Sequence, residues 1–355
     1  MSTIKILIVD DSAFVRQTLS SELSKHKDFE IVGMASDPYQ ARDIILNSDG
    51  VDVILLDIEM PRMDGLTFLS KLMKFKPTPV IVVSSLAKHG SDVAFEALRL
   101  GAVEALCKPG SMYALGDLTA QLPEKIRAAK SADLSKLMAK IQSAKPLGLQ
   151  KVDTSSKVVA IGASTGGVQA LEFILTSLPE GFPGTLIVQH MPPGFTKSFA
   201  DRLAKICRVD VKEASNGDII TAGKVFIAPG NFHMIVRNSG AQLFLEIKEG
   251  PLVAGHRPSV DVTFKSLAKA WGRNSIGVLL TGMGSDGAEG LFQLKLAGCH
   301  TICQDETTCV VFGMPKQAIN MGAATEVLPL DVIPKRLIEL LSSPTIEKPH
   351  ISTNP

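Results

Sequence analysis

Short runs of β-branched residues alternate along the chain with stretches in which apolar residues recur every three or four positions. The mostly apolar run 4–9 is typical of a buried strand, and Val15, Leu19 and Leu23 after it share one helical face, with Ser12 as the N-cap. The same reasoning predicts strands at 31–35, 51–56, 80–83 and 103–107, and helices after 65 and around 93–100 and 118–129. This alternation predicts a parallel sheet of five βα units in residues 1–128.

A change of composition separates this region from the second half of the chain. Residues 129–156 are rich in Ala, Lys, Ser and Gln and contain no strand-like run, which predicts a mobile linker. Strand patterns resume at 157–161 and recur at 185–188, 225–228 and 276–280. Residues 157–342 are therefore predicted to be a second α/β domain, doubly wound around a parallel sheet. Residues 343–355 contain three prolines and few apolar positions, which predicts a disordered tail.

Composition and charge narrow the possible functions. The 355 residues carry 37 Lys and Arg against 36 Asp and Glu, so a formal charge of +1 argues against nucleic acid as a partner. No apolar run is long enough to span a membrane, and the N-terminus lacks a signal peptide, so we expect a cytoplasmic protein that is not membrane-embedded. The five cysteines form no Cys-x-x-Cys pair, so neither a disulfide framework nor a zinc site is indicated.

Polar residues stand at the carboxyl ends of the predicted strands in the first domain. Asp10 and Asp11 follow the first strand and Asp57 the third, while Ser84 and Lys108 follow the fourth and fifth. Because these strand ends meet at one edge of the sheet, the three carboxylates would repel one another unless a cation bridges them, and Mg²⁺ suits oxygen ligands best. A carboxylate beside Mg²⁺ and an ammonium group is suited to attack phosphorus. Alone, the first aspartates could equally cap a helix.

The ordered set resembles the receiver domain of bacterial response regulators, a (βα)5 flavodoxin-like fold, over residues 1–128. The resemblance implies that Asp57 is phosphorylated, that the three aspartates bind Mg²⁺, and that Ser84 and Lys108 sense the phosphoryl group. One position departs from the family pattern, since Ala105 stands where receivers usually carry an aromatic residue. We therefore expect the signal to travel mainly through Ser84 and the backbone that follows it.

Three chemically reactive residues stand at strand ends in the second domain. Ser164 lies in a Gly-x-Ser-x-Gly turn between a strand and a helix, where the flanking glycines allow a sharp bend that exposes the hydroxyl. His190 follows the next strand, and Asp286 lies in a glycine-rich loop after another. As a triad, Ser164 is the nucleophile, His190 the general base and then acid, and Asp286 the residue that orients the imidazole, without a cofactor. The glycines around Met283 also offer backbone N–H groups for an oxyanion hole.

Spacing alone leaves other assignments open. His233 or His256 could take the place of His190, and Asp261 or Asp305 that of Asp286. A glycine-rich turn can also bind nucleotides, although this one lacks the Gly-x-Gly-x-x-Gly fingerprint and a Walker lysine. The chain order Ser, His, Asp also differs from that of the α/β-hydrolases.

Four motifs behind the receiver-like region carry a second resemblance. They are Gly-Ala-Ser-Thr-Gly-Gly at 162–167, Gln-His-Met-Pro at 189–192, Arg-Pro-Ser-Val-Asp at 257–261 and Leu-Thr-Gly-Met-Gly-Ser-Asp-Gly-Ala at 280–288. In this order they resemble the chemotaxis protein-glutamate methylesterases and protein-glutamine glutaminases. The resemblance implies the triad Ser164, His190 and Asp286 with Met283 as an oxyanion donor.

The same resemblance implies a substrate and a partner. The substrates would be γ-glutamyl methyl esters and certain glutamines on methyl-accepting chemotaxis receptors, and a chemotaxis histidine kinase would be the phosphodonor. The receiver would cover the Ser164 cleft until Asp57 is phosphorylated. Two alternatives remain: a non-enzymatic binding regulator under phosphorylation control, and a serine hydrolase with another ester substrate.

Overall fold

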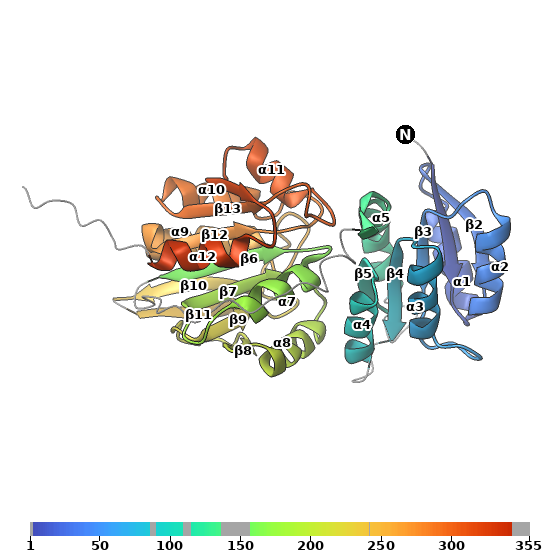
Figure 1. The fold of residues 1–355 in the computed structure, drawn as a ribbon, viewed down its shortest axis with the longest axis horizontal. Coiled ribbons are helices and arrows are strands. Elements are labelled where there is room, and N and C mark those ends of the chain that lie inside the picture. The colour runs from blue at the N-terminus through green and yellow to red at the C-terminus, as the bar shows by residue number, and fades with distance from the viewer. Residues whose placement is uncertain (1–2, 86–89, 109–114, 136–156, 241, 343–355) are drawn as a thin grey trace, which may run out of the picture.

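The computed structural model describes residues 3–85, 90–108, 115–135, 157–240 and 242–342. Most of the predicted linker and the whole predicted tail therefore lie outside the described residues. Figure 1 shows two α/β domains side by side, with the helices of each placed on both faces of its sheet.

The first domain is a five-stranded parallel sheet in the order β2-β1-β3-β4-β5. Its elements are β1 (Ile4–Val9), α1 (Ala13–Leu23), β2 (Phe29–Ala35), α2 (Pro38–Asn47), β3 (Val53–Leu56), α3 (Gly65–Phe75), β4 (Val80–Ser85), α4 (Gly90–Arg99), β5 (Glu104–Lys108) and α5 (Leu115–Ser131). The predicted cap of the first helix is confirmed, because the Ser12 hydroxyl accepts a hydrogen bond from the Val15 N–H at 3.4 Å. Five strands and the flanking helices thus follow the order that the hydrophobic pattern predicts.

The second domain is built on a seven-stranded parallel sheet in the order β14-β13-β12-β6-β7-β9-β8. Its strands are β6 (Val158–Ala163), β7 (Gly184–Gln189), β8 (Asp210–Glu213), β9 (Lys224–Ile227), β10 (His233–Ser239), β11 (Gln242–Lys248), β12 (Ser275–Leu279), β13 (His300–Gln304) and β14 (Glu326–Leu328). Its α-helices are α7 (Gly167–Ser177), α8 (Phe195–Ile206), α9 (Val260–Trp271), α10 (Ala288–Leu296), α11 (Met314–Asn320) and α12 (Ile333–Ser342). The doubly wound parallel architecture is confirmed.

The observed strands differ from the predicted ones in several respects, and β8, β13 and β14 have no predicted counterpart. β6 continues past Ile161 to Ala163, because β12 and β7 on either side still pair with Gly162. The antiparallel hairpin of β10 and β11 has no counterpart among the predicted strands. The second half of β10 is polar and exposed, so its hydrophobic pattern is weak.

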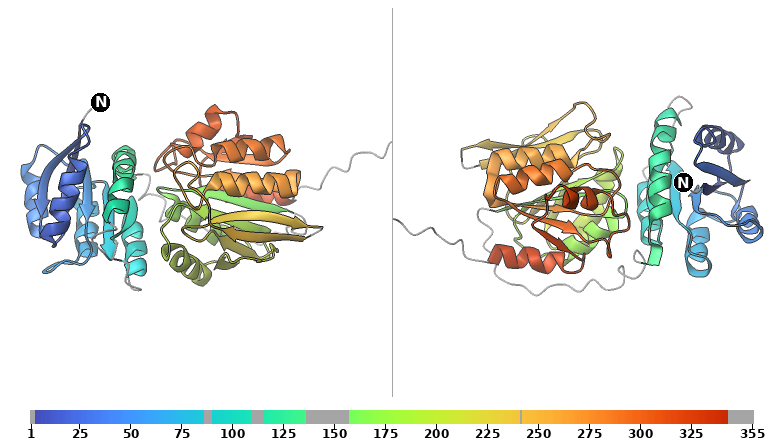
Figure 2. Two further views of the ribbon diagram at one scale, coloured as in Figure 1. Left: turned by 180° about the vertical axis from the view of Figure 1, so that it is seen from behind. Right: turned by 90° about the horizontal axis from the view of Figure 1, so that it is seen from above.

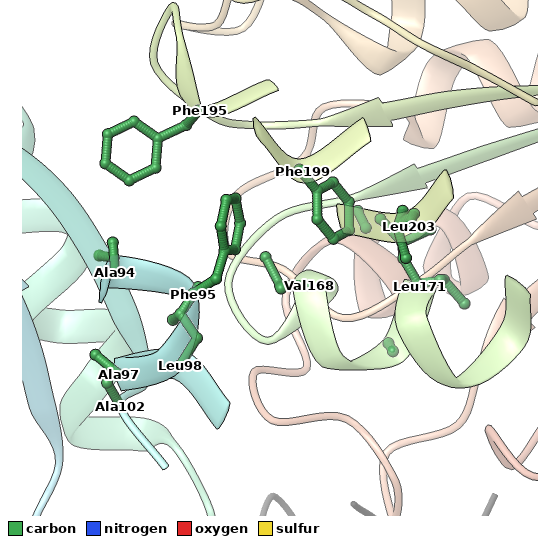
Figure 3. Packing of buried hydrophobic residues seen from close by; sticks show 14 of the residues in the cluster. Ala94, Phe95, Ala97, Leu98, Ala102, Val168, Leu171, Phe195, Phe199 and Leu203 are labelled. Atoms are coloured by element: carbon green, nitrogen blue, oxygen red, sulfur yellow. The ribbon is translucent and has the colours of Figure 1, made fainter. Parts of the chain in front are cut away.

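The two domains meet through α4, β5 and α5 on one side and through α7, α8 and the strand-end loops on the other, as the two views in Figure 2 show. Figure 3 shows Phe95 of α4 between Phe195 and Phe199 of α8. The Phe95 and Phe199 rings stack with centroids 5.6 Å apart, and Phe195 meets Phe95 edge-on at 6.2 Å. The Gln169 side chain of α7 also donates to the Leu98 carbonyl at 2.9 Å. One apolar core therefore continues from the first domain into the second.

No helix in the described part of the chain is both long and apolar enough to cross a bilayer.

Candidate functional site

Both candidate sites lie where the strand order reverses. In the first sheet β1 stands between β2 and β3, and in the second β6 stands between β7 and β12. The loops after such strands diverge to opposite faces of the sheet and leave a crevice at the carboxyl edge. Asp10 follows β1, and Ser164 follows β6. The topology therefore places each reactive group at the point where an open α/β sheet binds its ligands.

The predicted carboxylates of the first domain do meet. One oxygen each of Asp10, Asp11 and Asp57 lies within 4.8 Å of the others, with Asp10 and Asp57 buried and Asp11 exposed. The Lys108 ammonium pairs with the Asp57 carboxylate at 2.6 Å and with that of Asp10 at 2.7 Å. Ser84 lies in β4 and pairs in register with Cys107 of β5, and its side chain lies outside what the structure describes. Four of the five predicted polar groups are thus brought together.

Among the described residues, the cluster sets three carboxylates against one ammonium. Burial raises the pKa of Asp57, and the neighbouring charge of Asp10 adds to the increase, while Lys108 opposes it. Burial alone would lower the pKa of Lys108, but its bonds to Asp10 and Asp57 raise it. Three carboxylates around one ammonium are a set of hard oxygen ligands with excess negative charge, which fits Mg²⁺.

The turn after β6 gives Ser164 its position. The Ser164 N–H donates to the Thr281 carbonyl at 3.0 Å, and its carbonyl accepts from the Gly167 N–H at 2.7 Å and from the Gln189 side chain at 2.9 Å. Gly166 has φ +78°, and a Cβ there would lie 2.6 Å from Val310. Only glycine fits at that position without a shift in its neighbours. The serine is thus held on a tight strand-to-helix bend.

His190 and Asp286 form a direct pair beside this turn. The His190 N–H bonds to the Ala163 carbonyl at 3.2 Å, which places the histidine next to Ser164 at the sheet edge. Its Nε2 lies 2.8 Å from an Asp286 oxygen, and both side chains are buried. The Nδ1 atom of His190 is buried without a hydrogen-bond partner in the described structure. With Nε2 engaged, Nδ1 is the ring nitrogen left for proton transfer.

The start of α9 stabilises the charge of Asp286. The carboxylate accepts from the Ser259 hydroxyl at 2.7 Å, from the Val260 N–H at 2.7 Å and from the Asp261 N–H at 3.1 Å. Backbone N–H groups at a helix N-terminus favour a negative charge. Burial alone would raise the pKa of Asp286, but the bonds from His190, Ser259 and Asp261 lower it. Asp286 is therefore suited to remain an anion beside the imidazole.

Three of the four alternative residues form hydrogen bonds with other groups. His233 bonds to the Pro251 carbonyl at 2.9 Å and accepts from the Ser259 N–H at 3.3 Å. Asp261 accepts from the Gly290 N–H at 2.6 Å. Asp305 accepts from the Thr308 N–H at 3.0 Å, in a loop of its own. None of these three pairs with His190 in the described structure, whereas the His256 ring lies against that of His190.

The loop after β12 lies against the serine. A Cβ on Gly282 would come within 2.7 Å of the Ser164 Cβ, so this glycine permits the close approach. Met283 follows it, and in the described part of the chain its N–H has no hydrogen-bond acceptor. This places the candidate oxyanion donor one residue from the contact with Ser164.

The first domain packs against the residue that follows the serine. The Thr165 hydroxyl donates to the Glu104 carboxylate of β5 at 2.9 Å, and Lys125 of α5 pairs with the same carboxylate at 2.9 Å. Val310 and Val311, beside the Ser164 turn, share an apolar cluster with the core of the first domain. Only 3% of Ser164 is exposed. Sequence reasoning missed Glu104 and Ser259, although Ser259 falls within the quoted motif at 257–261.

A regulatory receiver domain joined to a hydrolase domain with a buried Ser, His and Asp set is the class of protein that this fold and this site define. Residues 6–119 match the response regulator receiver domain family, and residues 159–337 match the CheB methylesterase family. The chain belongs to the CheB methylesterase family of protein-glutamate methylesterases and protein-glutamine glutaminases, and it is an enzyme of that activity.

Individual relatives agree with the family match. The chain is 52% identical to protein-glutamate methylesterase/protein-glutamine glutaminase 2 of Syntrophus aciditrophicus, over 96% of this chain and all of that one. It is 51% identical to protein-glutamate methylesterase/protein-glutamine glutaminase 4 of Anaeromyxobacter dehalogenans, over 95% of each chain. The catalytic domain of Thermotoga maritima CheB methylesterase superposes with a TM-score of 0.51 and 45% identity, covering 52% of this chain and 99% of that one. The predicted domain limits themselves stay predictions.

Proposed function

We propose that this chain removes methyl groups from γ-glutamyl methyl esters, and deamidates certain glutamines, on methyl-accepting chemotaxis receptors, with Ser164, His190 and Asp286 as the catalytic residues. The observation that carries the assignment is the buried pair of His190 and Asp286 beside a serine held on a strand-to-helix bend. In this role the chain reverses receptor methylation during chemotactic adaptation.

The proposed reaction follows from the contacts. His190 Nδ1 removes the proton from the Ser164 hydroxyl as the serine oxygen attacks the ester carbonyl, and Asp286 stabilises the imidazolium that forms. The Met283 N–H donates to the developing oxyanion. The C–O bond to the methoxy group breaks, and the imidazolium protonates the leaving methanol. Water then repeats the sequence on the acyl-enzyme and releases the glutamate carboxylate, while a glutamine substrate loses ammonia instead.

We propose that phosphorylation of Asp57 controls this reaction by moving the receiver domain. Asp10, Asp11 and Asp57 would hold Mg²⁺, which neutralises phosphoryl oxygens when it is bound. A chemotaxis histidine kinase of the cytoplasm would supply the phosphoryl group, and Lys108 and Ser84 would contact it on Asp57. The contact of Glu104 with Thr165, next to the buried Ser164, supports this control, because a receiver docked there would restrict the approach of a receptor helix to the serine.

The test is to incubate the full chain with receptor fragments carrying radiolabelled methyl esters and to count released methanol. We expect release that requires Ser164 and accelerates with a small phosphodonor and Mg²⁺ only when Asp57 is present. Ser164→Ala and Asp57→Asn are the matched variants. Folded protein that releases no methanol under any condition would instead support the binding-regulator alternative.

A further inference from the structure

A second histidine lies against the first. The rings of His190 and His256 stack with centroids 3.7 Å apart and an interplanar angle of 12°. His256 is outside the Ser164, His190 and Asp286 set, and none of the steps above uses it. The stack covers one face of the His190 imidazole while the edges of that ring carry Nε2, bonded to Asp286, and the unpartnered Nδ1.

The loop that carries His256 is built to present its ring. Val253 and His256 exchange backbone hydrogen bonds of 3.1 and 2.9 Å around a two-residue turn. The residues between them, Ala254 and Gly255, both have positive φ, as this kind of tight hairpin turn requires. Next in the chain, the Arg257 guanidinium donates to the Asn231 side chain at 3.0 Å and to the Gly250 carbonyl.

This loop also leads directly to the residues that hold Asp286. Two positions after Arg257 comes Ser259, whose hydroxyl bonds to Asp286 at 2.7 Å and which caps α9. The segment 253–260 therefore contacts both partners of the buried pair, with His256 against the imidazole and Ser259 on the carboxylate. A fixed loop geometry sets both contacts together.

His256 is not suited to act as a base at neutral pH. Burial lowers its pKa to about 3, and the adjacent His190 and the ammonium of Lys125 on α5 contribute in the same direction, while Asp286 opposes them. The ring of His256 is therefore neutral where an esterase reaction would be measured. Its aromatic face, and not a titrating nitrogen, is what it offers to His190.

We propose that His256 is a positioning residue of the esterase reaction, whose ring holds the His190 imidazole in the plane that keeps Nε2 on Asp286 and leaves Nδ1 for Ser164. This inference rests on the proposed triad. The nearly parallel rings are in contact, so the His256 ring limits rotation of the imidazole and excludes water from one of its faces. Small misplacements of a catalytic group slow proton transfer. A ring that keeps His190 in the productive orientation should therefore raise kcat.

The experiment compares His256→Ala, His256→Phe and His256→Gln in the full chain, with phosphodonor and Mg²⁺, by methanol release from methylated receptor fragments. We expect His256→Ala to lower kcat about tenfold with KM within about twofold, since the change affects orientation and not substrate binding. His256→Phe should restore kcat to within about threefold of the parent because it keeps a flat ring. His256→Gln, which keeps a polar nitrogen but no ring, should resemble the alanine variant.

The matched control is His26→Ala. It removes a half-buried histidine of the receiver whose ring centroid lies 5.3 Å from that of Phe29. It should leave kcat and KM unchanged. An alanine variant as active as the parent, a loss that appears in KM alone, or rescue by glutamine and not by phenylalanine would each overturn the proposal. If the alanine variant does not fold, as judged by circular dichroism, the proposal is tested by comparing kcat of His256→Phe with kcat of His256→Gln. A parent chain without Ser164-dependent release would overturn the proposed triad itself.

Discussion

The two strand-end sites occupy the same topological position in two parallel sheets but balance their charge in opposite ways. In the receiver, burial raises the pKa of Asp57, which shares one ammonium with Asp10. In the hydrolase domain the pKa of Asp286 is lowered, because His190, Ser259 and the N-terminus of α9 bond to it. Among the described residues, the first site sets three carboxylates against one ammonium, which suits the Mg²⁺ and phosphoryl group proposed for it. The second already has donors for its carboxylate within the protein. A carboxylate at a strand end therefore takes its role from the donors around it.

The largest expected effect is at the hydrolase site. Asp286→Asn removes the negative charge that stabilises the imidazolium of His190, so we expect kcat for methanol release to fall by about 10³- to 10⁴-fold. Asp210→Asn, at an exposed position at the start of β8, is the control and should leave the rate unchanged. Equal activity in the two variants would show that Asp286 has no role in the chemistry.

The carboxylate cluster of the receiver predicts an effect on Mg²⁺ affinity. Asp10→Asn removes one of three oxygen ligands and part of the excess negative charge, so we expect Mg²⁺ binding to weaken by at least about tenfold. Isothermal titration calorimetry on the full chain measures the affinity. Asp43→Asn, on the exposed surface of α2, is the control. Unchanged affinity in the Asp10 variant would remove this aspartate from the metal site.

A smaller effect is expected at the contact between the two domains. Glu104→Leu removes the acceptor of the Thr165 hydroxyl and the partner of Lys125, so the receiver should leave the serine uncovered more often. A hydrogen bond to a charged group contributes about 1.5–3 kcal/mol, and we expect the unphosphorylated rate to rise about tenfold. The phosphorylated rate should not change. Glu30→Leu, at an exposed position on β2, serves as the control, and a Glu104 variant with the parent's unphosphorylated rate would contradict the prediction.

The smallest effect sharpens the role of α9. Ser259→Ala removes one of the donors to Asp286 and the N-cap of the helix, so we expect kcat to fall about threefold and the free energy of unfolding to fall by about 1 kcal/mol. Ser12→Ala is matched to it, because Ser12 also caps a helix but contacts no residue of the hydrolase site. Thermal unfolding should show a loss of stability in both variants, and only the Ser259 variant should lose kcat. A comparable loss of kcat in both would argue against a specific role.

The positions of the reactive groups along the strands could be predicted from the hydrophobic pattern, but spacing alone did not choose among the histidines, and His190 was favoured by the motif at 189–192. Asp10, Asp57 and Ser164 each follow a buried strand that the local hydrophobic pattern identifies, so their meeting at a sheet edge follows from topology. His190 follows the strand β7, and His233 is the first residue of the strand β10. The structure distinguishes them, because the register of β6 and β7 sets the His190 N–H on the Ala163 carbonyl and His190 pairs with Asp286, whereas His233 bonds to Pro251.

The unpredicted residues act across long separations in sequence. Glu104 bonds to Thr165, 61 positions away, and Ser259 bonds to Asp286, 27 positions away. Each is unremarkable in its own segment, since a glutamate that begins a strand and a serine that begins a helix have ordinary local explanations. Their roles arise from packing between elements, which a local pattern does not specify. The contact between Glu104 and the residue after Ser164 is likewise a property of the domain interface.

The burial of Ser164 beneath the receiver has a consequence for how the phosphorylation state is set. Under the proposed control, a receptor helix and the receiver compete for the same surface, so binding of one disfavours binding of the other. Linked equilibria are reciprocal, and a phosphoryl group that favours receptor binding by some factor must itself be favoured by receptor binding to the same extent. A methylated receptor is then an effector of Asp57 as well as a substrate of Ser164. A chain bound to a methylated receptor would therefore hold its receiver away from Ser164 more often than a free chain does.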